Sequence, residues 1–411
     1  MGVKKHAHTG FGSTVASMQE DEMNRREFCS SVVAVAAIGP VGAFGDVGCS
    51  SGSASSVAPL PADIRETTHR IYFEAAQNMR RLDDATVDLV VTSPPYPMIE
   101  MWDSVFSDQS PAVADALARD PARAFELMHQ ELDKVWKECF RLLKDGGFMC
   151  VNIGDATRTI NKDFQLYNNH SRIVSACNRI GFVNLPNIIW RKQTNAPNKF
   201  MGSGMLPCGA YVTLEHEWIL VFRKGGKRTF KSESERALRR CSAFFWEERN
   251  KWFSDLWEIK GAKQTISNSR TRERNASFPI EIPFRLINMY SQMGDTVLDP
   301  FLGLGTTTVA AMISNRNSIG FEIDSDLEPS INDFIAGVSV DAMRDIIRSR
   351  LENHKIFIKE RVTSGNDVKY MNKRLNCAVM TSQETDIDLA MPNKVEKDNR
   401  SFSFRCGYQS L

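Results

Sequence analysis

The 411-residue sequence lacks long hydrophobic runs, since no stretch approaches the roughly 20 apolar residues of a membrane-spanning helix without being broken. A multi-span membrane protein is therefore excluded, and we expect no membrane partner. The net charge is only +1, so any preference for charged partners must be local. With 42% hydrophobic and 25% charged residues, the composition is that of a globular protein. The length predicts one large domain with insertions, or two domains.

The cysteines and histidines form no ligand or disulfide pattern. The nine cysteines are scattered, odd in number and without a Cys-x-x-Cys pair, which predicts a reducing compartment and no Cys-based zinc site. The seven histidines show neither His-x3-His nor His-Glu-x-x-His spacing. We therefore expect no metal.

Residues 1–60 differ from the rest of the chain, because they are rich in Gly, Ser, Ala and Val. Arg25 and Arg26 precede a small apolar run from Ser30 to Phe44, which resembles a twin-arginine export signal. The other interpretation is a disordered extension. An exported binding protein is thus one hypothesis for the function.

From Thr68 onward, short buried strands alternate with amphipathic helices. Strands are expected at 69–73, 87–92, 148–153, 188–192, 216–223, 296–299 and 318–322, and helices at 125–143, about 170–180, 280–292, 306–314 and 334–361. This order predicts an α/β fold with a doubly wound, mostly parallel sheet. The tail from Thr363 is polar and shows no clear pattern.

An acid–glycine segment follows the expected strand 296–299 and opens a helix. It contains Asp299, Phe301, Gly303, Gly305 and Thr306. Glycines let a backbone turn sharply and approach a ligand closely, although a tight βα turn is the alternative. Glu322 ends the next strand, where an acid accepts hydrogen bonds from ribose hydroxyls in nucleotide sites. The segment lacks Gly-Lys-Ser/Thr, which disfavours nucleoside triphosphates.

A second candidate site follows the expected strand 87–92. There Ser93 is followed by Pro94, Pro95 and Tyr96. The prolines freeze the backbone, which fixes the Ser93 hydroxyl and the Pro94 carbonyl as hydrogen-bond acceptors. Tyr96 adds an aromatic face. The set suits an exocyclic amine on a heteroaromatic base, and the alternative is a Pro-rich loop with a packed tyrosine.

Ser-Pro-Pro-Tyr followed 206 residues later by Asp-Pro-Phe-x-Gly-x-Gly-Thr resembles the amino-group DNA methyltransferases that use S-adenosylmethionine. The order, with the catalytic motif first, resembles their β class. Further pieces that resemble family motifs are Leu142–Gly147, Ile189–Lys192, Ser277–Pro279 and Gly320–Asp324. The resemblance covers residues 68–330 and implies a Rossmann-like methyltransferase sheet with an inserted basic target-recognition region.

The resemblance also implies roles for the site residues. Ser93 and the Pro94 carbonyl would accept hydrogen bonds from the target amine, within the loop that Pro95 completes, and Tyr96 would stack on a flipped base. The residues expected to bind S-adenosylmethionine are Phe278, Asp299, Phe301, Gly303, Gly305, Thr306 and Glu322. The reaction needs no metal. No residue is identified for the adenine of the cofactor.

The resemblance also bears on the target. Ser at the first motif position is similar to enzymes that methylate cytosine N4, and adenine N6 is the alternative. Pro207-Cys208 is the pair that cytosine C5 chemistry uses, but its place in the chain is wrong for that family, so we expect Cys208 to be a buried small residue. The motif order and the basic insert favour double-stranded DNA over RNA or a protein amide.

These expectations divide the chain into an extension (1–60), a catalytic half (61–222), a basic target-recognition region (223–274), a cofactor-binding half (275–330), and a helical extension with a polar tail (331–411). The basic region holds 15 Lys and Arg against 7 Asp and Glu. Cation clusters drive duplex binding, so Arg239, Arg240, Arg272 and Arg274 are predicted phosphate contacts, with a solvated surface as the alternative. The region's Trp and Phe residues are expected in the core.

Two further expectations concern the cell. A cognate restriction endonuclease is an expected partner. The location is expected to be cytoplasmic and close to the nucleoid, since an exported enzyme would meet neither genomic DNA nor S-adenosylmethionine.

Overall fold

The computed structural model describes residues 64–192, 201–261, 278–398 and 402–411. The predicted export signal, Ser277, Arg272 and Arg274 lie outside these residues. Within the described part of the chain, no helix is long and apolar enough to cross a membrane.

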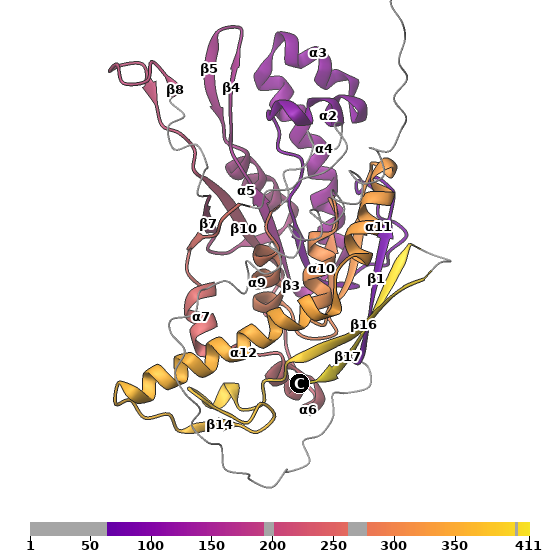
Figure 1. Ribbon diagram of the computed structural model, residues 1–411. Coiled ribbons are helices and arrows are strands. Elements are labelled where there is room, and N and C mark those ends of the chain that lie inside the picture. The colour runs from indigo at the N-terminus through magenta and orange to yellow at the C-terminus, as the bar shows by residue number, and fades with distance from the viewer. Residues whose placement is uncertain (1–63, 193–200, 262–277, 399–401) are drawn as a thin grey trace, which may run out of the picture.

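An eleven-stranded mixed sheet forms the centre of the described structure (Figure 1). Its middle is parallel and consists of β3 (Leu143–Ile153), β2 (Val87–Thr92), β12 (Thr296–Asp299), β13 (Asn317–Phe321) and β1 (Glu66–Tyr72), in that spatial order. All six residues of β2 are buried, as expected for an apolar strand covered on both faces. The predicted doubly wound, Rossmann-like sheet is confirmed.

Further strands extend both edges of the sheet, and all their pairings are antiparallel except that of β11 with β7. Beyond β3 lie β10 (His216–Lys224), β7 (Ile188–Arg191) and β11 (Leu256–Glu258), with β6 (Phe182–Asn184) paired to β10. Beyond β1 lie β17 (Ser403–Ser410) and β16 (Ala390–Asp398). The sequence patterns predicted β7 and β10 on the first of these sides, but no strand beyond β1 on the other.

Helices cover both faces of the sheet. One apolar core includes residues of α4 (Pro121–Leu142) and α5 (Asn169–Ile180), with α2 (Asp103–Gln109) and α3 (Pro111–Arg119) beside them. The other core includes α9 (Glu281–Tyr290), α10 (Thr306–Ile313), α11 (Glu328–Ala336) and α12 (Val340–Thr363). Short 3-10 turns span Glu100–Trp102, Ser325–Leu327 and Ser382–Glu384.

The C-terminal tail corrects an expectation. After α12 we expected only a polar tail, but the chain forms the small hairpin β14 (Tyr370–Asn372) and β15 (Cys377–Val379), then β16 and β17. In β17, Phe404, Cys406 and Tyr408 alternate along the strand and are buried against the core. Because every second residue is apolar, this strand carries a period-two signal despite its polar composition.

The basic region also differs from the expectation. Its described part holds α6 (Glu233–Cys241), α7 (Trp246–Trp252) and β11, which pairs with β7 inside the main sheet. Phe245, Trp252 and Trp257 are buried, as predicted for its aromatic residues, whereas Trp246 and Phe253 are each 42% exposed, so the prediction holds for only part of the set. This part of the segment is therefore built into the core of the main sheet instead of standing apart from it.

Arg228 of the basic region lies at the amino ends of the parallel strands. Arg228 forms ion pairs with Asp295 and Asp88, which stand just before β12 and at the start of β2. In Figure 1, α6 and α7 lie at the opposite end of the molecule from the hairpin β4 (Ala156–Ile160) and β5 (Asp163–Tyr167), which follows the carboxyl end of β3. Arg240 is paired with Glu233 and Asp386.

A second hairpin stands with β4 and β5 at the carboxyl end of the sheet (Figure 1). It consists of β8 (Met201–Gly202) and β9 (Ala210–Tyr211), and the ring of Tyr211 stacks on Phe164 of β5 with centroids 4.6 Å apart. Cys208 lies in its loop and is exposed with a φ of 67°, so the expectation of a buried residue is wrong. The positive φ of Cys208 is typical of a residue in a tight turn, and such turns lie at the surface.

Candidate active site

A cavity of about 860 Å³ opens where the carboxyl ends of β2, β12 and β13 meet. Ligand crevices in open parallel sheets lie at this edge, because the loops after neighbouring strands diverge there. The cavity is lined by nearly all the predicted site residues: Ser93, Pro94, Pro95, Tyr96, Phe278, Asp299, Phe301, Gly303, Thr306 and Glu322. Two motifs that are 206 residues apart in the sequence thus share one cavity.

A short hydrogen bond joins the two motifs directly. Thr92 Oγ1, at the end of β2, donates to Asp299 Oδ1 at 2.6 Å, and the Phe301 backbone N–H donates to the same oxygen at 3.1 Å. Burial raises the pKa of Asp299 to about 6, while hydrogen bonds from Thr307, Thr92 and the backbone oppose the rise. Asp299 therefore links the carboxyl ends of β2 and β12.

Glu322 closes the glycine loop from the neighbouring strand. Its Oε2 accepts a hydrogen bond from the Gly303 backbone N–H at 3.0 Å, and its Oε1 accepts one from Asp324 N–H at 2.9 Å. Burial raises the pKa of Glu322 to about 7, and the nearby charges of Asp324 and Asp299 add to the rise against the lowering effect of the two backbone bonds. This carboxylate changes its charge close to neutral pH.

Gly305 is the one predicted residue that does not line the cavity. It lies at the N-cap of α10 with a φ of 92°, in the left-handed region that favours glycine. A Cβ there would lie 3.0 Å from Ile335 Cδ1, so the glycine serves the turn and the packing of α11. This geometry favours a structural role for Gly305 over the expected close approach to a ligand, whereas Gly303 does face the cavity.

The cavity is strongly acidic. Its carboxylates are Glu74, Asp108, Asp299, Glu322, Asp324 and Asp326, and no Lys, Arg or His lines it among the described residues. Several like charges around one concave site produce a potential that attracts cations and repels phosphate groups. The cavity therefore suits a ligand with positive groups and without phosphates.

A buried polar network stands behind Ser93. Tyr96 Oη donates to Glu217 Oε2 at 2.8 Å, and Asn152 Nδ2 lies 2.8 Å from Tyr96 Oη and 2.7 Å from Glu217 Oε2. Ser93 Oγ lies 3.2 Å from Tyr96 Oη, and Lys192 Nζ is paired with Glu217 Oε1. Burial and the charge of Glu217 raise the pKa of Tyr96 well above its ordinary value, so the phenol keeps its proton.

Sequence reasoning gave no role to Asn152 and Glu217. Both lie on neighbouring strands, β3 and β10, within runs of apolar residues. A lone carboxylate or amide in a buried strand must find a hydrogen-bond partner, and this was the available signal. The partners could not be named, because they come from strands and loops far apart in the sequence.

Comparison with known proteins agrees with this geometry. Residues 87–333 match the family model described as DNA methylase. The chain belongs to this family. This DNA methylase is 50% identical over 343 residues to the Type II methyltransferase M.MthZI of Methanothermobacter thermautotrophicus, which covers 82% of this chain and 95% of that protein.

Two further relatives support the assignment. The Type II methyltransferase M.MjaI of Methanocaldococcus jannaschii is 50% identical over 284 residues, covering 66% of this chain and 91% of that protein. A putative DNA modification methylase of Thermus thermophilus, solved in complex with S-adenosyl-L-methionine, is 30% identical with a TM-score of 0.51, covering 66% of this chain and 96% of that one.

The family makes this chain an enzyme that acts on DNA with S-adenosylmethionine as methyl donor. The hypotheses of a binding protein and of RNA or protein methylation are thereby set aside. The cavity fits the cofactor, since S-adenosylmethionine carries a sulfonium, an ammonium and a ribose diol but no phosphate. The acidic lining and the carboxylate of Glu322 match these groups.

Proposed function

We propose that this DNA methylase methylates the exocyclic N4 amine of a cytosine that is flipped out of a DNA duplex. The supporting observation is that Ser93, the first residue of Ser-Pro-Pro-Tyr, shares a cavity with the acid–glycine loop. Serine at this position resembles the N4-cytosine enzymes of the β class, to which we assign the chain. Flipping costs a few kcal/mol, which the pocket must offset by contacts with the base.

In this proposal the catalytic loop acts by positioning. Ser93 Oγ and the Pro94 carbonyl accept the two amine hydrogens, Pro95 keeps the loop rigid, and Tyr96 stacks on the base. The lone pair of the amine is conjugated with the ring, so it is a poor nucleophile. Two fixed acceptors draw the nitrogen towards tetrahedral geometry and aim its lone pair, which is catalysis by orientation and electrostatics.

The acid–glycine loop and its neighbours would hold the cofactor. Glu322 accepts hydrogen bonds from the ribose hydroxyls, Asp299 faces a positive group, and Gly303 brings the backbone close. Phe278 and Phe301 supply apolar walls, while Thr306 lines the cavity at the start of α10. When bound, S-adenosylmethionine supplies an electrophilic methyl group on a sulfonium.

We further propose that the duplex approaches at the carboxyl end of the sheet. The hairpins β4–β5 and β8–β9 and helix α3 lie at this end, away from the described arginines of α6 (Figure 1). The β8–β9 hairpin exposes Met205, Leu206 and Val212 by 86%, 68% and 85%. Apolar side chains of this kind enter base stacks and help to unstack them, which suits an enzyme whose target must leave the helix.

Two proposals extend to the cell. Since the relatives M.MthZI and M.MjaI are Type II methyltransferases, we infer that a cognate restriction endonuclease accompanies this chain. We also infer a cytoplasmic location, where both DNA and S-adenosylmethionine are present.

The deciding experiment is incubation with methyl-labelled S-adenosylmethionine and mixed-sequence duplex DNA, followed by digestion and nucleoside analysis. We expect label in N4-methylcytosine. Label in N6-methyladenine would replace cytosine by adenine in the proposal, and label in 5-methylcytosine would overturn the role of Ser93. A parallel reaction with single-stranded DNA measures the contribution of the duplex.

A further inference from the structure

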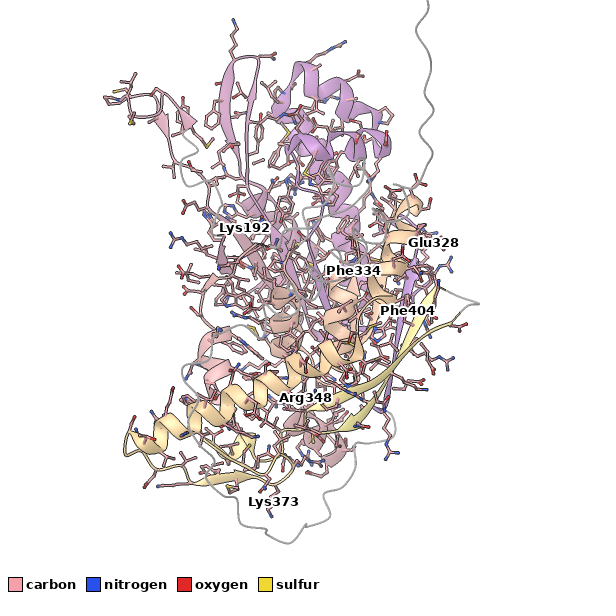
Figure 2. All side chains as sticks on the ribbon, viewed as in Figure 1. Lys192, Glu328, Phe334, Arg348, Lys373 and Phe404 are labelled. Atoms are coloured by element: carbon pink, nitrogen blue, oxygen red, sulfur yellow. The ribbon has the colours of Figure 1, made fainter. Side chains whose placement is uncertain are left out.

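Glu217 lies on β10 and is 8% exposed, yet it is tied to the catalytic loop. One of its oxygens, Oε1, is paired with Lys192, which directly follows β7 and is labelled in Figure 2. The other, Oε2, accepts from Tyr96 at 2.8 Å and from Asn152 at 2.7 Å. The carboxylate is thus shared between a cation and two neutral donors.

The direction of each hydrogen bond follows from the donors available. A carboxylate only accepts, so the single hydroxyl hydrogen of Tyr96 points to Glu217. Asn152 must present its Nδ2 to this carboxylate, and the same nitrogen is 2.8 Å from Tyr96 Oη. Its Oδ1 has no hydrogen-bond partner among the described residues, so the amide orientation is governed by the contacts of its nitrogen.

The direction of the Tyr96 hydrogen bond also determines that of Ser93. Because the hydrogen of Tyr96 is committed to Glu217, Tyr96 Oη can only accept at its 3.2 Å contact with Ser93 Oγ. Ser93 must therefore donate its own hydrogen backwards to Tyr96. Asn152 Nδ2 also lies 3.5 Å from Ser93 Oγ, a long contact that leaves acceptor capacity on this oxygen for an amine N–H in the cavity that Ser93 lines.

We propose that Glu217 is a positioning residue for methyl transfer: by orienting the hydroxyl of Tyr96, it makes Ser93 a hydrogen-bond acceptor. The inference rests on the proposed function only in that the target is an amine, and it applies equally to cytosine N4 and adenine N6. Glu217 does not line the cavity, and it acts on the amine through the hydroxyls of Tyr96 and Ser93.

The informative variant is Glu217→Gln, which keeps the size of the side chain. The Lys192 ammonium can only donate, so the new amide turns its oxygen to Lys192 and its NH₂ to Tyr96. Tyr96 is then free to donate to Ser93, whose hydrogen is released towards the cavity. We expect kcat to fall about 10²- to 10³-fold, as for the loss of one oriented transition-state hydrogen bond, with unchanged affinity for S-adenosylmethionine.

A second variant separates orientation from stability. In Lys192→Met with Glu217→Gln, the lysine no longer competes for the amide oxygen, which can turn back to Tyr96 and Asn152. We expect this double variant to be more active than Glu217→Gln alone, although it retains fewer native contacts. A merely structural role predicts the opposite order, and melting temperatures of both variants provide the folding control.

Tyr96→Phe completes the test by cutting the link while keeping the ring. In this background Glu217→Gln should cause little further loss of kcat. Wild-type kcat in Glu217→Gln, or no recovery in the double variant with Lys192→Met, would overturn the proposal. Nucleoside analysis of the same reactions keeps it separate from the base assignment, since label on adenine with the same ranking of variants would refute only cytosine N4.

Discussion

Cofactor binding should depend on pH through Glu322, whose pKa burial raises to about 7. In the ionised form this side chain offers a charged acceptor to the ribose hydroxyls and a negative charge to a cationic ligand. Protonation removes both. Affinity for S-adenosylmethionine should therefore be highest above the pKa and fall as the pH decreases through it.

The size of the effect can be bounded. A hydrogen bond to a charged group contributes about 1.5–3 kcal/mol, and its loss leaves a desolvated donor. This range corresponds to roughly 10- to 150-fold in Kd, at about 1.4 kcal/mol for each factor of ten. The ionised fraction changes tenfold for each pH unit below the pKa, so most of the loss should occur between about pH 7 and about pH 5.

Isothermal titration calorimetry of the apo-enzyme across this range measures the effect. Glu322→Gln should weaken binding at high pH and remove the step near neutrality, leaving a lower step from Asp299, whose pKa burial raises to about 6. Asp326→Asn is the matched control, because it removes one carboxylate of the same cavity from an exposed position. A pH-independent Kd in the wild type, or an unchanged step in Glu322→Gln, would refute the reasoning.

Other outcomes follow from the same structure. Ser93→Ala should reduce kcat by about 10²-fold or more without changing the Kd for S-adenosylmethionine; parallel losses in both would contradict its assignment to the amine. Replacing Met205 and Leu206 by serine should weaken duplex binding, measured by fluorescence anisotropy, whereas neutralising the two consecutive arginines of α6 should leave affinity and salt dependence unchanged; the reverse ranking would return DNA contact to the basic segment. His354 donates to Glu247 and to the Ala378 carbonyl, at 3.0 and 2.9 Å. Burial lowers its pKa, but hydrogen bonding with Cys377, Glu247 and the Ala378 backbone, together with the charge of Glu247, raises it to about 10. Its stabilising contribution is complete below the unfolded pKa of about 6.5 and is lost as the pH rises towards 10, so urea unfolding should show this loss in the wild type but not in His354→Gln.

The acidic cavity gives these tests a common physical basis. Six carboxylates line it, and no Lys, Arg or His is among its described lining residues, so the cavity disfavours anionic ligands and favours a cationic cofactor. The sequence could not show this, because Glu74 and Asp108 come from segments that carry no recognisable motif. Their contribution arises only when the loops after different strands converge.

Local patterns were enough for much of the fold. The apolar run of β2 and the glycine turn before α10 predicted their elements within a residue or two, since both depend on nearby residues. The alternation in β17 was equally local, but it was obscured by polar neighbours. The hairpin β8–β9 has only two residues per strand, which is too short for a periodic signal.

What the sequence determined by itself was the chemistry of the two motifs and their order, because a Ser-Pro-Pro-Tyr turn and an acid–glycine turn are rigid local structures with few alternative uses. Tertiary structure alone decided three other matters. It placed Gly305 outside the cavity, it moved the described basic segment to the amino ends of the strands, and it brought Glu217 behind Tyr96. The last two outcomes depend on the direction of β10, because this antiparallel strand begins beside the carboxyl end of β3, where Glu217 lies, and ends beside its amino end, where the basic segment follows. Such pairings join residues far apart in the sequence, 67 positions for Arg228 and Asp295 and 121 for Tyr96 and Glu217, and no local pattern encodes them.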